Sequence, residues 1–108
     1  MAERLFGVET EYALTAISAG GQSLDRAQII EGLMHLARRT LPHLPDEYSG
    51  GMFLQNGARF YVDAGHHPEF TTPELGNPWD AVRYIQAGER ILVRLATEQP
   101  ADPRAAPP

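Results

Sequence analysis

The chain has 108 residues, of which 43% are hydrophobic and 21% are charged, and its formal net charge is −5. This size fits one small domain or a segment of a larger one, and the absence of cysteine excludes disulfides and thiol catalysis. The acidic balance without a basic stripe argues against nucleic acid as a partner, and no apolar run reaches the roughly 18 residues of a membrane-spanning helix, so we expect a soluble cytoplasmic protein.

The first half of the chain predicts a strand, a helix and a loop. Residues 4–14 are rich in aromatic and β-branched side chains, which favour a strand, and residues 18–22 are typical of a turn. Ser23 is expected to cap a helix over about 24–40. The apolar residues at helical spacing in it are Ile29, Leu33, Leu36 and Ala37. Prolines and glycines indicate that residues 41–51 form a loop.

A β-hairpin is predicted over residues 52–63. Asn56 and Gly57 form a strong tight-turn signal between a short strand at 52–54 and a second strand at 59–63. Residues 64–77 are expected to be irregular, with a short strand at 69–72.

The last predicted element is a helix that begins at Pro78, with Asn77 as its cap. The seam of this helix is expected to contain Tyr84, Ile85, Gly88, Leu92, Leu95 and Ala96. Residues 99–108 are rich in proline and alanine and predict a solvated linker. The order strand, helix, hairpin, helix indicates an α+β fold with an antiparallel sheet and helices on one face. So few strands suggest the first segment of a larger enzyme.

Two acids lie on one face of the first predicted strand. Side chains alternate along a strand, so Glu9 and Glu11 share a face with Gly7, whereas Val8 and Tyr12 point the other way. Two carboxylates are costly to bury unless a cation meets them, and Mg²⁺ is the natural candidate. The alternative is an exposed acidic face on an edge strand.

The second strand of the hairpin also has a polar face, formed by Arg59, Tyr61 and Asp63. Arginine suits phosphate through its planar fork of donors, and Asp63 could act as a base or nucleophile beside a metal. The alternative is an ordinary structural ion pair between Arg59 and Asp63.

His66, His67 and Glu69 raise the alternative of a zinc site together with Asp63. Adjacent histidines on an extended backbone point to opposite sides, however, and the sequence has neither an H-E-x-x-H motif nor a cysteine. We therefore expect His67 to shape the loop through hydrogen bonds. The acids and the arginine together fit a magnesium–nucleotide site better, and because the P-loop and G-x-G-x-x-G motifs are absent, this site would lie on a sheet face.

Four motifs in order resemble the N-terminal region of one enzyme family. They are G-V-E-T-E-Y at 7–12, N-G-A-R-F-Y-V-D at 56–63, H-P-E-F-T-T-P-E at 67–74 and A-G-E-R at 87–90. They resemble the Pup ligases and Pup deamidases (depupylases), relatives of the glutamine synthetase-like carboxylate–amine ligases. The resemblance implies that residues 3–98 are the N-terminal segment of a larger ATP-dependent catalytic domain with a glutamine synthetase-like fold.

The resemblance also implies roles for individual residues. The Mg²⁺ ligands would be Glu9, Tyr61 and Glu69, with help from Glu11. ATP would contact Arg59 and Thr72. Asp63 would be the catalytic acid/base or nucleophile, and the rest of the nucleotide pocket would lie beyond residue 108.

Two chemistries occur in the family. The ligase joins the C-terminal glutamate of Pup, a ubiquitin-like modifier, to a lysine of a protein, whereas the deamidase attacks the amide of a C-terminal glutamine or the isopeptide bond of a conjugate. Tyr-Val-Asp at 61–63, Thr-Pro-Glu at 72–74 and Pro-x-Asp-Ala-Val at 78–82 favour the deamidase slightly. The spacing from Asp63 to Glu69 and the short connection between residues 12 and 52 favour the ligase. The sequence is also compatible with a divergent third branch and with a non-catalytic binding module that has an acidic recognition face.

Overall fold

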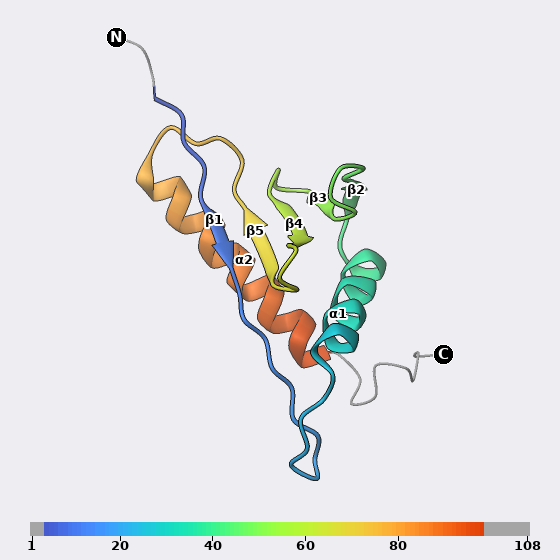
Figure 1. The fold of residues 1–108 in the computed structure, drawn as a ribbon. Coiled ribbons are helices and arrows are strands. Elements are labelled where there is room, and N and C mark those ends of the chain that lie inside the picture. Colours follow the sequence, from blue (N-terminus) through green and yellow to red (C-terminus); the bar gives the residue numbers. More distant parts are fainter. Residues whose placement is uncertain (1–3, 99–108) are drawn as a thin grey trace.

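The structure, a computed structural model, describes residues 4–98 as a five-stranded antiparallel sheet with two helices (Figure 1). In chain order the elements are β1 (Glu9–Glu11), α1 (Arg26–Thr40), β2 (His43–Pro45), β3 (Met52–Leu54), β4 (Arg59–Val62), β5 (Pro68–Thr71) and α2 (Pro78–Glu98). The strand order in the sheet is β1-β5-β4-β3-β2. The predicted α+β class with an antiparallel sheet is confirmed.

The core lies between the helices and one face of the sheet. Phe60 of β4 is paired directly with Phe70 of β5, and their rings are stacked with centroids 4.4 Å apart. The rings of Tyr12 and Phe70 meet edge to face, with their centroids 6.3 Å apart. Leu33 of α1 is buried in the same cluster, and a Cβ atom at Gly88 of α2 would lie 3.1 Å from the Phe70 ring. Both helices therefore pack on the phenylalanine face, as predicted.

The hairpin and the start of α2 form where the sequence predicts them. Gly57 has a φ of 89°, and the side-chain oxygen of Asn56 accepts a hydrogen bond of 2.9 Å from the Ala58 N–H. At the other site, the side-chain oxygen of Asn77 accepts a hydrogen bond of 2.9 Å from the Asp80 N–H, which caps the helix that begins at Pro78.

The N-terminal predictions need two corrections. The strand expected over 4–14 is confined to β1, and Phe6 forms only an isolated bridge with Leu75. The cap of α1 is Asp25 and not Ser23, because the Asp25 carboxylate accepts a hydrogen bond of 3.1 Å from the Ala27 N–H. A carboxylate two residues before an N–H group is close enough to accept its hydrogen bond and so to cap the helix.

Further differences concern the middle and the end of the chain. The loop expected over 41–51 contains β2, which pairs with β3 at the edge of the sheet. Ala96 is exposed and does not belong to the seam of α2. The linker predicted at 99–108 lies outside the described residues. None of the helices within residues 4–98 combines the length and the hydropathy that a membrane span requires.

Candidate active site

The register of the sheet brings the polar side chains of three strands to one face. Glu69 of β5 lies between Glu11 of β1 and Tyr61 of β4, and it is directly paired with both. In the neighbouring row, Thr71 lies between Glu9 and Arg59. Directly paired residues of an antiparallel sheet share a face, and the helices cover the opposite, phenylalanine face. The two strands with a polar face that the sequence predicts therefore belong to one surface.

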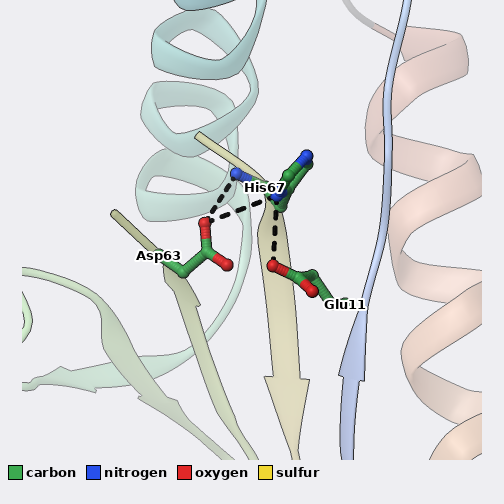
Figure 2. A group of neighbouring side chains, drawn as sticks. All are labelled: Glu11, Asp63 and His67. Atoms are coloured by element: carbon green, nitrogen blue, oxygen red, sulfur yellow. Dashed lines mark hydrogen bonds and ion pairs between the residues drawn. The ribbon is translucent and has the colours of Figure 1, made fainter. Parts of the chain in front are cut away.

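Glu11, Asp63 and His67 form a cluster at one end of this surface, beyond the end of β4 (Figure 2). The Nδ1 atom of His67 lies 3.1 Å from Oε1 of Glu11 and 3.7 Å from Oδ1 of Asp63. One ligand atom from each of the three residues falls within 4.8 Å of the others. This is a spacing at which one cation could contact all three side chains.

The backbone of the β4–β5 connection fixes Asp63. Its Oδ1 accepts hydrogen bonds from the N–H groups of Gly65 at 2.9 Å and His67 at 3.0 Å. The prediction that His67 shapes this loop through hydrogen bonds is confirmed. The other carboxylate oxygen, Oδ2, accepts no hydrogen bond from the backbone of residues 4–98.

The two acids of the cluster shift each other's pKa in opposite directions. A proton shared with Asp63, together with the charge of Asp63, raises the pKa of Glu11. The hydrogen bond from Glu11 lowers the pKa of Asp63, and the N–H groups of His67 and Gly65 act in the same direction. Asp63 is thus the acid of the pair that ionises first.

Glu69 is the buried acid of the surface, with 8% of its area exposed. Burial raises the pKa of Tyr61, and the adjacent Glu69 contributes to the same shift. The Tyr61 hydroxyl also lies 3.4 Å from the Thr71 hydroxyl. A buried carboxylate that is paired directly with a second acid, Glu11, favours a cation at this position.

Arg59 forms an ion pair with Asp46. The alternative that the sequence left open, an ion pair between Arg59 and Asp63, is therefore wrong. The Arg59 Nε donates to Asp46 Oδ2 at 2.6 Å, and the guanidinium lies over the Tyr61 ring, 4.3 Å from its centroid. Asp46 was not predicted as a site residue. Asp46 begins the sequence Asp-Glu-Tyr-Ser-Gly, which is typical of a turn. This pattern predicts the turn but not the contact between Asp46 and Arg59.

Thr72 lies apart from the cluster. Its hydroxyl accepts a hydrogen bond of 3.0 Å from the Val8 N–H and donates one of 2.9 Å to the Pro73 carbonyl. These bonds tie the chain before β1 to the end of β5. The structure therefore shows a backbone-linking role for this hydroxyl, and its predicted contact with ATP stays a prediction.

The two adjacent histidines lie on different sides of the loop, but the backbone there is a turn and not the extended chain that the sequence predicted. His66 has a φ of 59° and lines a surface cavity with Met34, His35 and Arg38 of α1, whereas His67 faces Glu11 and Asp63. The zinc site that would have combined both histidines with Glu69 is thus not assembled in the described residues.

Comparison with known proteins shows the family of the chain. A family model described as Pup-ligase protein matches residues 4–106. The chain belongs to the Pup-ligase family. It is 40% identical over 96 residues to the protein named Pup–protein ligase from Acidimicrobium ferrooxidans, an alignment that covers 89% of this chain and 20% of the relative.

A solved structure agrees with this membership in the Pup-ligase family. The crystal structure of the complex between the prokaryotic ubiquitin-like protein Pup and its ligase PafA matches with a TM-score of 0.73 and 29% identity. The match covers 89% of this chain and 18% of that chain. The present chain thus spans about a fifth of the length of these relatives. Both relatives are ligases, and neither supports the slight preference for a deamidase that the sequence suggested.

The lowered pKa of Asp46 predicts that this side chain makes the stability of the fold depend on pH. The hydrogen bond from Ser49 is the largest cause, and burial opposes it while Arg59 and the Tyr48 N–H add to it. Because the folded-state pKa lies below the ordinary value of 3.8, the ionised Asp46 stabilises the fold above that pH, and this contribution is lost as pH falls through the folded value. We expect Asp46→Asn to lower Tm at neutral pH, with a difference from wild type that narrows on acidification.

Thermal unfolding at a series of pH values between about 7 and 3 would measure this difference. Glu47→Gln is the matched control, because Glu47 is the exposed neighbouring acid. A Tm difference for Asp46→Asn that stays constant over the whole series would contradict the assignment.

Proposed function

We propose that this chain supplies the magnesium- and ATP-binding strands and the catalytic aspartate of a Pup-modifying enzyme. The observation that carries the proposal is the common face of β1, β5 and β4, which holds Glu9, Glu69 and Arg59 and has the cluster of Glu11 and Asp63 at one end. Membership in the Pup-ligase family supports it.

The donor set suits Mg-ATP. Carboxylate oxygens are the ligands that Mg²⁺ prefers, and we assign Glu9 and Glu69 to magnesium with Glu11 assisting. Tyr61 is assigned to the same site because it is paired directly with Glu69 on the polar face. Arg59 and Thr72 are assigned to ATP, with Arg59 offering planar donors to a phosphate. When bound, Mg-ATP supplies the phosphoryl group that activates a carboxylate, and the metal offsets the negative charge that gathers there.

Asp63 is assigned as the general base. Its Oδ1 is held by two backbone N–H groups, so the carboxylate has a fixed orientation while Oδ2 can face the substrate. Asp63 is ionised at neutral pH, as a proton acceptor must be, and the fixed position of its carboxylate is what supports the role of base. In the proposed reaction Asp63 takes the proton from a lysine amine while that amine attacks the phosphorylated carboxylate, so that the C–N bond forms, the C–O bond to phosphate breaks and phosphate leaves.

We propose the ligase branch, because the family and both similar proteins carry that description. The test incubates the full-length protein and Mg-ATP with a lysine-containing acceptor protein and a Pup-like peptide. One peptide ends in glutamate and the other in glutamine, and mass spectrometry follows both. Conjugates formed from the glutamate peptide alone are expected. Release of ammonia from the glutamine peptide would instead assign the deamidase branch, and no reaction of either peptide would favour a non-catalytic binding module.

The proposed metal site predicts that Glu69→Gln weakens Mg²⁺ binding. The amide keeps the size of the buried side chain but removes its charge, and we expect the apparent affinity for Mg²⁺ at saturating ATP to fall by roughly 10-fold or more. A titration of activity with Mg²⁺ measures the change. Glu74→Gln is the control, because Glu74 is an exposed glutamate outside the polar face. Equal Mg²⁺ dependence of the two variants would remove Glu69 from the metal site.

A further inference from the structure

The side chain of Asp46 is almost completely buried, although its turn lies at the surface and outside the predicted site. Only 3% of its area is exposed. Its Oδ1 accepts a hydrogen bond of 3.1 Å from the Tyr48 N–H, and its Oδ2 accepts bonds of 2.6 Å from the Ser49 hydroxyl and from Arg59 Nε. A buried carboxylate needs such partners, and here they come from its own turn and from β4, the central strand of the sheet.

The contact with Asp46 uses one donor of Arg59 and leaves the rest of the guanidinium available. Nε is bound to Asp46, and the plane of the group lies over the Tyr61 ring at 4.3 Å. The two terminal nitrogens of Arg59, which carry four of its five N–H donors, make no hydrogen bond to the described residues. The arginine is therefore held on two sides while its phosphate-binding end is unpaired within residues 4–98.

We propose that Asp46 is a positioning residue, which holds the Arg59 guanidinium over Tyr61 in the orientation that binds a nucleotide phosphate. The proposal rests on the proposed function, in which Arg59 contacts ATP. A free arginine samples many rotamers, and fixing it before the ligand arrives reduces the entropy that binding must otherwise lose. The lowered pKa of Asp46 agrees with this role, since the carboxylate stays charged at neutral pH.

A structural role in the turn is the competing explanation, because Asp46 also binds Tyr48 and Ser49. Asp46→Asn separates the two. An asparagine oxygen can still accept from the Tyr48 N–H, but its NH₂ group cannot accept from Arg59 Nε. We expect the Kd of the full-length protein for Mg-ATP, measured by calorimetry below the melting temperature, to rise by roughly 5- to 50-fold. Ser49→Ala removes a turn contact of the same carboxylate and should leave the Kd near the wild-type value.

A double-mutant cycle with Arg59→Gln gives the decisive comparison. If Asp46 acts through Arg59, Asp46→Asn has no further effect on the Kd once Arg59 is replaced. A loss of affinity that persists in the Arg59→Gln background would overturn the proposal, because Asp46 would then act through the turn. Should Asp46→Asn fail to fold, Asp46→Ser keeps a short acceptor in the turn and takes its place in the cycle.

The same cycle distinguishes failure of this proposal from failure of the proposed function. A Kd for Mg-ATP that rises in Arg59→Gln but does not change in Asp46→Asn would overturn the positioning role alone. Wild-type protein that does not bind Mg-ATP would overturn the proposed nucleotide site, and the role of Asp46 with it.

Discussion

Replacing Asp63 with asparagine is expected to lower turnover by at least about 100-fold, while Mg-ATP still binds. Asparagine keeps an oxygen for the N–H groups of Gly65 and His67, so the β4–β5 connection should retain its shape. The variant loses the negative charge that accepts a proton from the attacking amine. Single-turnover conjugation of a Pup-like peptide measures the chemical step, and calorimetry measures Mg-ATP binding separately.

Asp25→Asn provides the matched control for this substitution. Asp25 is the exposed cap of α1, and asparagine caps a helix about as well as aspartate, so turnover and stability should match the wild type. Undiminished conjugation by Asp63→Asn would rule out Asp63 as the base. Loss of both conjugation and Mg-ATP binding would instead place Asp63 among the groups that hold the metal.

The largest effect on stability is expected from Gly51→Ala. A Cβ atom at this buried position would overlap the Phe60 carbonyl oxygen and stand 2.5 Å from the Cβ of Tyr61. Both contacts belong to the backbone region of β4, which cannot move aside as the end of a flexible side chain could. We expect the free energy of unfolding to fall by about 3 kcal/mol, at the upper end for overpacking, as measured by denaturant unfolding of the full-length protein.

Gly76→Ala is the control for this prediction. A Cβ atom at Gly76 would have no neighbour within 4 Å, and the backbone there is not in the left-handed region. The stability of Gly76→Ala should therefore stay within about 0.5 kcal/mol of the wild type. If both alanine variants are equally stable, the backbone at Gly51, just before β3, does not lie against β4.

Local signals explain which elements could be predicted. The hairpin depends on Asn56 and Gly57, and the start of α2 depends on Asn77 and Pro78, whose hydrogen bonds and dihedral angles are set within a few residues. The alternation of side chains along β4 predicted correctly that Phe60 faces the core while Arg59 and Tyr61 share the other face.

Tertiary contacts explain what was missed. The short edge strand β2 ends at Pro45, and its pairing with β3 is not visible in a sequence punctuated by proline and glycine. The ion pair between Asp46 and Arg59 joins residues 13 positions apart, and only the folded turn brings them together. The alternation of side chains along each strand indicated which acids share a face. The pairing of Glu69 with both Glu11 and Tyr61, however, depends on the order of the strands.

The alternation of the two faces also limits how the length of this segment can change during evolution. In β4 and β5 every second residue belongs to the polar face, and the residues between them, Phe60 and Phe70, belong to the core. A one-residue insertion or deletion inside either strand would exchange the two sets and place a carboxylate against the helices. We therefore expect length variation among homologues to fall in the connection at 63–67 and to be absent from the strands on either side of it.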